Sequence, residues 1–314
     1  MNRIIEYTIP TEYDGYSIER YLVERGYTHQ NIVELKKIHR SVVINDEWMH
    51  MGDRLTEGDV LTVNIIEDAN SEHIPPVKLP FPVVYEDEDI VVVDKPSGMP
   101  IHPSLNNYEN TLGNAAAYYY QSQGVNFVFR CINRLDRDTS GLTIIAKHMV
   151  SAGNLYNQMT ERKIHREYIA IVQDEDMSGE SGYVCESRFV GKLPDRMTID
   201  YPIARREGST IEREVNMDSG ETAVTHFEVM DRRDNLALLR LHLDTGRTHQ
   251  IRVHMSYIGH PLIGDWLYNP TDTRMTRQAL HSASLDFIHP ITGQNMHLES
   301  NIPEDMRLIW NSNV

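Results

Sequence analysis

Residues 133–142, with the sequence NRLDRDTSGL, place two carboxylates and two guanidinium groups within five consecutive positions. The apolar run LTIIAK overlaps its end and is typical of a buried strand. Gly141 and the preceding Thr-Ser pair favour a turn, so we expect the charged cluster on a loop at the edge of a strand. Such a loop is either a solvated turn or a place where charge is gathered for chemistry.

A second charged stretch, DTGRTHQIRVH at residues 244–254, predicts the start of a helix. Thr248 is a good N-cap, and Gly259 followed by Pro261 predicts that the helix ends near residue 258. One face of this helix is apolar and contains Ile251, Met255 and Ile258. Arg252 lies off that face, so we expect its side chain to point into a cleft. Arg247 precedes the N-cap and would reinforce the positive end of the helix.

The third stretch, RKIHREYIA at residues 162–170, reads as a strand that follows a basic segment. Side chains alternate between the two faces of a strand, so Arg166 and Tyr168 are expected on the same face. A tyrosine on a strand usually packs in a core or an interface. Beside basic residues, it also offers a stacking platform for a nucleobase.

Residues 81–314 mix strands and helices without regular helical crossovers. Helices are predicted at 111–123, 150–161 and 248–258. Strands are predicted in PVVYEDEDIVVVDKP, GLTIIAKH, IHREYIAIV, THFEVM and NLALLRLHL. This order favours an α+β fold in which a mixed, largely antiparallel sheet forms one large domain.

Residues 1–68 predict a separate, small α/β module with two helices, at 16–26 and 31–40, followed by two short β-rich runs. The second helix carries Lys36, Lys37 and Arg40, which are either an RNA-binding face or the solvated side chains of a structural cap. Residues 69–80, ANSEHIPPVKLP, contain two adjacent prolines and predict a linker.

The formal charge of −16 argues against a protein that coats RNA generically, because non-specific affinity comes from neutralising phosphates. A locally basic groove remains compatible with this charge. The sequence shows neither a long apolar run nor a secretory signal, which predicts a cytoplasmic protein. Cys131 and Cys185 lack metal-site spacing and are expected to be reduced thiols.

Together these stretches resemble the RluA-type family of RNA pseudouridine synthases, from about residue 81 to the C-terminus. The resemblance rests on five blocks in matching order and spacing: DKPSGMPIHPS, NRLDRDTSGL, REY, TGRTHQIRVH with IGHPLIGD, and ALHSASLDFIHPITG. It implies a catalytic domain at 81–314. The N-terminal module is similar to the S4-like RNA-binding module that many members carry, although here it is only weakly basic.

The resemblance also implies roles for single residues. Asp136 corresponds to the family's nucleophile, and Arg134 to the arginine that enters the space left by a flipped uridine. Tyr168 corresponds to the active-site tyrosine, and Arg252 to the arginine that pairs with the aspartate. Asn133 departs from the family's usual histidine, and we assign it no proton transfer because an amide carries no charge.

Further contacts are expected from polar side chains near these blocks. We expect Arg137, Arg247 and His249 to bind the substrate together with Arg134. Six basic side chains are expected to contact RNA more broadly: Lys36, Lys37, Arg40, Arg162, Lys163 and Arg166.

The implied reaction isomerises uridine to pseudouridine in a structured RNA. No group is oxidised and no phosphate is transferred, so we expect neither cofactor nor metal. The expected partner is ribosomal RNA or transfer RNA, and the expected state is a monomer. The sequence does not choose between attack at C6 of the base and attack at C1′ of the sugar.

Three other functions fit parts of the sequence. An aspartic protease would use Asp138 and Asp244, each of which begins an Asp-Thr-Gly/Ser-like loop, but flanking arginines would keep both acids ionised. A metal hydrolase would draw on His249, His254, His260 and His281, whose spacing does not match a paired zinc motif. The third alternative is a non-catalytic RNA-binding or ribosome-assembly protein.

Overall fold

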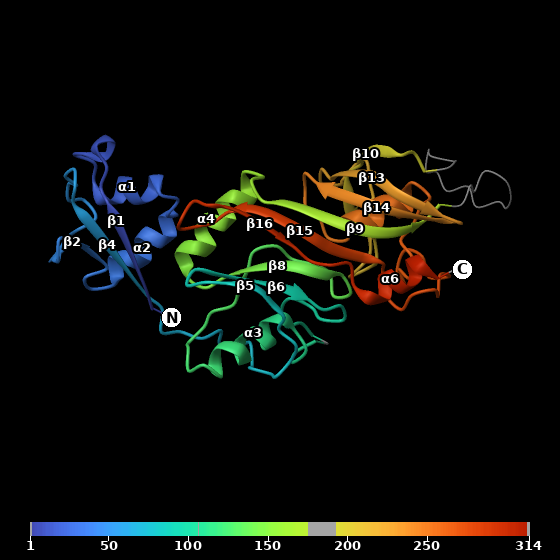
Figure 1. Cartoon of the computed structure of the whole chain (residues 1–314), viewed down its shortest axis with the longest axis horizontal. Coiled ribbons are helices and arrows are strands. Elements are labelled where there is room, and N and C mark those ends of the chain that lie inside the picture. The colour runs from blue at the N-terminus through green and yellow to red at the C-terminus, as the bar shows by residue number, and fades with distance from the viewer. Residues whose placement is uncertain (1, 106, 175–192, 313–314) are drawn as a thin grey trace.

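The computed structural model describes residues 2–105, 107–174 and 193–312, so Cys185 lies outside the described residues. It is an α+β fold, as predicted, with a long sheet in the middle and a small unit at one end (Figure 1). None of the described helices has the length and apolarity needed to cross a bilayer. The burial of Cys131 raises the pKa of its thiol to about 12, which keeps the thiol protonated.

The large sheet contains ten strands within the described residues. They are β5 (Val83–Glu86), β6 (Ile90–Lys95), β7 (Arg130–Cys131), β8 (Ser140–Ala146), β9 (His165–Gln173), β10 (Arg196–Asp200), β13 (Val224–Arg233), β14 (Leu236–Leu243), β15 (Leu280–Ile288) and β16 (Asn295–Glu299). Their order is β10-β13-β14-β9-β15-β8-β6-β5, with β16 beside β15 and β7 beside β8. The pairs are antiparallel except β8 with β15, so the predicted sheet type is correct.

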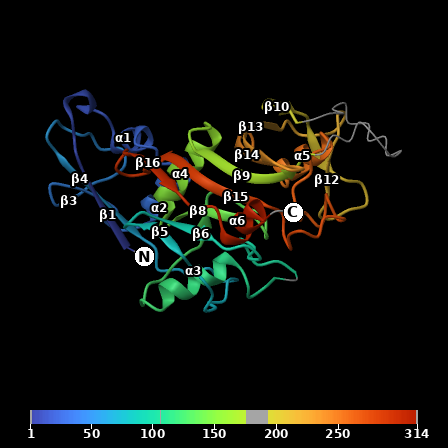
Figure 2. The same ribbon diagram turned by 45° about the vertical axis from the view of Figure 1, so that its right-hand side comes forward.

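Four helices and a short hairpin cover this sheet in the described part of the chain. They are α3 (Leu112–Gln121), α4 (Met149–Thr160), α5 (Gln250–Tyr257) and α6 (Glu304–Asn311), with β11 (Ile203–Arg205) paired to β12 (Arg213–Val215). α3 packs against Val91 and Val93, whereas α4 packs near Ile90 and Val92. Because side chains alternate along β6, these two helices lie on opposite faces of the sheet, as Figure 2 also shows.

The N-terminal unit has its own four-stranded sheet, in the order β1-β4-β2-β3. Its elements are β1 (Asn2–Thr8), a 3-10 turn η1 (Thr11–Tyr13), α1 (Ile18–Glu24), α2 (His29–Lys37), β2 (Val42–Ile44), β3 (Glu47–Trp48) and β4 (Val60–Ile66). Both predicted helices are present. The prediction that the sheet follows the helices was incomplete, because β1 precedes them and pairs with β4 along its whole length.

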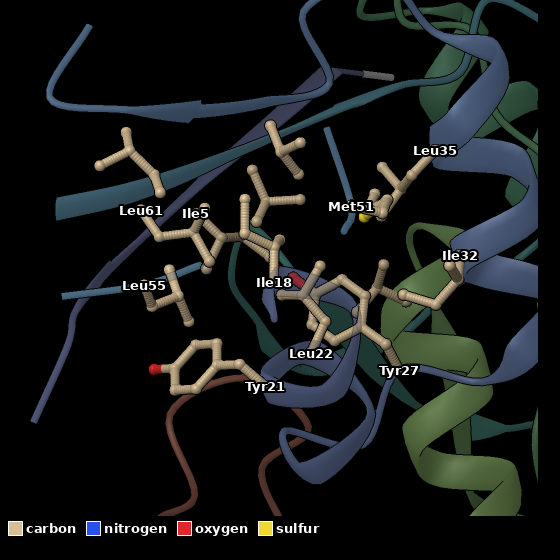
Figure 3. Close-up of a cluster of buried hydrophobic side chains, with 14 of the residues drawn as sticks. Ile5, Ile18, Tyr21, Leu22, Tyr27, Ile32, Leu35, Met51, Leu55 and Leu61 are labelled. Atoms are coloured by element: carbon tan, nitrogen blue, oxygen red, sulfur yellow. The ribbon is translucent and has the colours of Figure 1, made fainter. Parts of the chain in front are cut away.

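The N-terminal unit also has its own core, in which Ile5, Ile18, Leu22 and Leu61 interdigitate (Figure 3). This core continues into the large domain through Val150 of α4. The side chain of Asn31 in α2 donates to the carbonyl of Met149, and Arg3 pairs with Asp89 at 2.8 Å. Residues 69–80 contain no helix or strand, and the carbonyl of Pro75 accepts a hydrogen bond from Asn114 of α3.

Gly141 has a different role from the predicted turn residue. It lies inside β8, opposite Ser282 of β15, with φ +115°. A Cβ atom at this position would lie 2.2 Å from the carbonyl oxygen of Ser282. Glycine is therefore required because the two backbones approach more closely than a side chain permits. The loop ends at Thr139, two residues before Gly141.

Two buried polar side chains fix the loop that precedes β8. Asn133 donates to the carbonyl of Leu142 at 3.0 Å and accepts from the N–H of Ile144 at 2.8 Å. Lys95, at the end of β6, is fully buried, and its ammonium donates to the carbonyls of Pro96, Met99 and Arg137. The position of residues 133–139 thus depends on hydrogen bonds to strand backbone and to one lysine.

Lys95→Met should destabilise the fold because it leaves three carbonyls without their shared donor. We expect a loss of about 2–5 kcal/mol in the free energy of unfolding, measured by urea denaturation. Burial lowers the pKa of Lys95 to about 7, so the unfolded chain binds the proton more tightly than the folded chain does. Wild-type stability relative to Lys95→Met should therefore rise between about pH 7 and 10.

Lys78→Met is the matched control, because Lys78 is exposed and lies between the two domains. Its stability should follow that of wild type at every pH. An equal pH dependence of unfolding in wild type and Lys95→Met would contradict the role given to Lys95.

Candidate active site

A pocket lies where the loop before β8, the start of β9 and the start of α5 meet. Its lining comprises Arg134, Leu135, Asp136, Thr139, Arg166, Tyr168, Leu243, Gly246, Arg247, His249, Gln250, Ile251, Arg252 and Leu280. The three sequence stretches singled out by their charge therefore converge on one pocket. Four of the lining residues are arginines, and Asp136 is the one acid among them.

Asp136 and Arg252 form an ion pair, with Nη1 of the arginine 3.2 Å from Oδ2 of the aspartate. The Asp136 side chain retains 24% of its exposure, whereas Arg252 retains 4%. The carboxylate is thus reachable from the pocket, and the guanidinium that holds it is buried behind it.

Asp265 holds the other edge of the Arg252 guanidinium. Nε and Nη2 of Arg252 donate to its two oxygens at 2.7 and 2.8 Å, a bidentate arrangement that fixes the plane of the fork. Asp265 is fully buried and also accepts from the backbone N–H groups of Leu267 and Tyr268. Burial alone would lower the pKa of Arg252, but the bonds to Asp265 and then the charge of Asp136 raise it, so this arginine stays charged.

The start of α5 differs from the prediction. Thr248 is not the N-cap, because the helix begins at Gln250 and His249 occupies the capping position without a side-chain cap. The Gln250 side chain instead holds the loop before the helix, because it accepts from the backbone N–H of Arg247 and from the hydroxyl of Thr245, both at 2.9 Å. Gly259 follows the helix with φ +87°, as expected for the residue after a C-cap.

His249 has a left-handed backbone, with φ 59° and ψ 17°. Such a conformation costs a non-glycine residue about 1–3 kcal/mol, and it persists only where neighbouring contacts enforce it. Here it brings Nε2 of His249 within 4.0 Å of Oδ2 of Asp136. Burial lowers the pKa of His249, which favours a neutral ring.

Arg166 and Tyr168 both reach the pocket from β9, as period-two alternation predicts. Burial raises the pKa of the Tyr168 phenol, and the charge of Arg166 partly opposes this. The Arg166 guanidinium lies over Gly246, where a Cβ atom would be 3.2 Å from Nη1. Because burial raises its pKa, the Tyr168 phenol stays protonated in the wall of the pocket.

Of the three other arginines expected to bind the substrate, two line the pocket and one does not. Arg134 is exposed at the pocket mouth, and its charge lowers the pKa of His102 in addition to burial. Arg247 also lines the pocket and pairs with Glu221. Arg137 is outside the lining and forms a 2.7 Å ion pair with its neighbour Asp138.

Most of the basic residues expected to contact RNA lie away from the pocket. Lys36 and Lys37 of α2 pair with Glu19 and Glu34, each at 2.8 Å. The guanidinium of Arg40 donates to the carbonyl of Asp46. Two more follow α4: Arg162, with φ 58°, and Lys163, paired with Glu161. Of the six, Arg166 reaches the pocket.

Residues 1–68 hold seven Lys and Arg against thirteen Asp and Glu, so this module is acidic overall and not weakly basic.

Three residues at the site were not predicted: Asp265, Tyr268 and Lys95. Asp265 ends the block IGHPLIGD, so the motif contained it, but nothing in its spacing indicates a bond to Arg252 thirteen residues earlier. Lys95 stands in the block DKPSGMPIHPS, but nothing in that block indicates its bond to the carbonyl of Arg137. Tyr268 lies in a segment that reads as an ordinary loop.

The geometry does not assemble the two other catalytic sites considered. Asp138 pairs with Arg137, whereas Asp244 pairs with His226, so these carboxylates do not share a proton. Among the described residues, the group close enough to hold a metal is Asp87, Asp89 and His289, and it includes none of the four histidines proposed for a hydrolase.

Several known proteins are similar to this chain in sequence. The sequence profile described as RNA pseudouridylate synthase matches residues 89–257. The protein named uncharacterized RNA pseudouridine synthase YjbO, from Bacillus subtilis, is 37% identical over 92% of this chain and 96% of its own length. Ribosomal large subunit pseudouridine synthase D of Escherichia coli O6:H1 is 34% identical over 81% of this chain and 76% of its own length.

A solved structure, human RNA pseudouridylate synthase domain containing 1, has the same fold. It superposes with a TM-score of 0.56 and 24% identity, covering 72% of this chain and 85% of its own. The profile covers more than half of the chain, and relatives above 30% identity span most of it. The chain therefore belongs to the RNA pseudouridylate synthase family, as its RluA-type motifs predict.

Proposed function

We propose that this chain converts uridine to pseudouridine at defined positions of ribosomal RNA, with Asp136 as the nucleophile. The observation that carries the proposal is the ion pair between Arg252 and a partly exposed Asp136 inside an arginine-lined pocket. Ribosomal RNA is favoured because several relatives above 30% identity are named ribosomal large subunit pseudouridine synthases.

The reaction breaks the N1–C1′ bond, rotates the uracil and joins C5 to C1′. C5 loses its proton and N1 gains one, so substrate and product are isomers and no electrons are transferred. A carboxylate promotes this by attacking C1′ or C6 and forming a covalent intermediate that splits one difficult step into two.

The charges around Asp136 suit this role. Arg252 orients the carboxylate through one hydrogen bond, while Asp265 fixes the arginine from behind. Asp136 is therefore oriented by one ion pair, and the part of its side chain that remains exposed faces the pocket.

The target uridine must leave its stack to reach Asp136, which costs a few kcal/mol in a duplex and less in a loop. Arg134, exposed at the pocket mouth, is suited to fill the gap left in the RNA. The ring of Tyr168 in the pocket wall is suited to pack against the extracted base. Arg166 and Arg247 supply positive charge for the neighbouring phosphates.

The proposal extends to the organisation of the chain. Residues 81–314 would carry out catalysis, and residues 1–68 would act as an S4-like module joined by the segment 69–80. Because that module is acidic, we propose that it orients the RNA through a limited patch and adds little non-specific affinity. The proposed protein is a cytoplasmic monomer that uses no cofactor.

Asp136→Asn should abolish turnover because the amide keeps the shape of the side chain but is a poor nucleophile. RNA labelled with tritium at uridine C5 releases tritium to water as pseudouridine forms. We expect release to fall by at least ~10³-fold while RNA binding and the urea midpoint change little.

Ribosomal and transfer RNA transcripts should be assayed separately, so that the responding RNA identifies the substrate class. Asp138→Asn is the matched control, since Asp138 lies on the same loop but outside the pocket lining. Tritium release by Asp136→Asn at the wild-type rate would exclude this nucleophile. Failure of wild type to act on any RNA, including total RNA from a strain lacking the protein, would favour the non-catalytic RNA-binding alternative.

Arg252→Ala should lower both stability and rate. It leaves Asp265 buried without its partner, which should cost about 3–5 kcal/mol in the free energy of unfolding. The rate should be measured at a temperature at which the variant is folded, and we expect kcat to fall about 10²-fold because the carboxylate loses its orientation.

Arg252→Lys tests the orientation directly, because lysine keeps the charge but cannot bind two carboxylates with a planar fork. It should recover part of the stability and little of the rate. Arg240→Ala removes a surface arginine paired with Glu167 and should leave kcat unchanged. A fully active Arg252→Lys would show that charge alone is sufficient.

A further inference from the structure

We propose that His249 and Tyr268 are positioning residues for the nucleophile: Tyr268 fixes the tautomer of the His249 ring, and the ring N–H then steadies one oxygen of Asp136. The inference rests on the proposed function, which supplies the role of Asp136. It is carried by the left-handed backbone of His249, its hydrogen bond to Tyr268 and its approach to Asp136.

The hydrogen bonds of Tyr268 indicate which nitrogen of His249 carries the proton. The phenol oxygen accepts the backbone N–H of Arg213 at 2.9 Å and lies 2.9 Å from Nδ1 of His249. A tyrosine has one hydrogen to donate, and burial raises the pKa of Tyr268 to about 12, so that hydrogen is retained. Donation to Nδ1 leaves the histidine proton on Nε2, the nitrogen that faces the negative charge of Asp136.

Burial lowers the pKa of His249 and so favours a neutral ring. The charged groups that face it are Asp136, Arg252, Asp265 and Arg213, two of each sign. The ring of Tyr268 lies edge-on to the imidazole at 5.7 Å and faces the guanidinium of Arg252 at 5.0 Å. Tyr268 thus contacts both side chains that approach Asp136.

Both supports of Asp136 approach the same oxygen. Arg252 Nη1 lies 3.2 Å from Oδ2 and His249 Nε2 lies 4.0 Å from it. Oδ1 has no hydrogen-bond partner among the described residues, so it is the oxygen available to attack the uridine. The longer contact is expected to shorten when RNA fills the pocket, because catalytic hydrogen bonds are often long in unliganded enzymes.

The first test is structural and needs no RNA. Nitrogen NMR of the full chain, labelled with ¹⁵N in the histidine rings, distinguishes the two neutral tautomers. We expect His249 to carry its proton on Nε2 in wild type and to become a mixture of tautomers in Tyr268→Phe. A wild-type ring protonated on Nδ1 would overturn the proposal whatever the enzyme does to RNA.

The second test is kinetic. Tyr268→Phe should lower kcat roughly 10- to 100-fold with little change in KM, since the phenol lies behind the catalytic groups. His249→Ala should lose at least as much. The double variant should be no slower than His249→Ala, because Tyr268 acts through the ring that is then missing. Losses that multiply would instead show that the two residues act separately.

His249→Gln and Tyr257→Phe complete the set. Glutamine retains an N–H donor near Asp136 and should recover part of the rate lost in His249→Ala, which a merely structural histidine would not require. Tyr257 lies on the same helix but outside the pocket lining, so its change to phenylalanine should leave kcat and the His249 tautomer unchanged. A wild type inactive on all RNA would refute the proposed function, while the NMR result would still decide the tautomer.

Discussion

The site depends on one buried cation, the guanidinium of Arg252. A charge moved into a protein interior loses several kcal/mol of solvation unless partners replace the water. Asp265 replaces most of it, with two short bonds and an orientation fixed by the N–H groups of Leu267 and Tyr268. Asp136 is therefore left with a single 3.2 Å bond to a cation that is already neutralised. This arrangement directs the carboxylate and leaves it reachable from the pocket, as the proposed nucleophile requires.

The fold brings these groups together through the parallel contact of β8 and β15. The close backbone approach at Gly141 and Ser282 sets the end of the loop that carries Asp136. Arg277 extends the same framework, since it binds the carbonyl of Asp138 and also forms a bidentate pair with Asp305 of α6. The loop that carries Asp136 is thus fixed from the sheet and from the C-terminal helix, although its own sequence is polar and rich in charge.

The sequence predicted the features that follow from local patterns. Hydrophobic periodicity located helices and strands in both domains, and alternation along β9 put Arg166 and Tyr168 on one face. Contacts between distant segments could not be predicted in this way. Thr248 had the right chemistry for a cap, but the helix begins two residues later, at Gln250, whose side chain binds the N–H of Arg247 and the carbonyl of Val224.

The same limit explains the other differences. Gly141 was expected in a turn because its need for a missing Cβ comes from β15, which lies about 140 residues further along the chain. In the sequence, Asp265 and Tyr268 are ordinary polar residues of a loop. Their roles follow only from the fold, which places them beside Arg252 and His249. Residues that line the pocket were visible in the sequence as a pattern of charge, whereas the residues that hold them in place were visible only through packing.

The distribution of charge accounts for how an acidic protein can act on RNA. The chain carries −16 overall, and many basic side chains are paired with acids, including Lys36 and Lys37 of α2 and Arg247 and Arg252 of the pocket. Arg134 and Arg166 also line the pocket and have no ion pair among the described residues. Local potential depends on where charges lie, so these two guanidinium groups offer positive charge for phosphates at the pocket of an otherwise acidic protein. Binding is then favourable only where an RNA presents its target at this one place, and weak non-specific affinity becomes a source of selectivity.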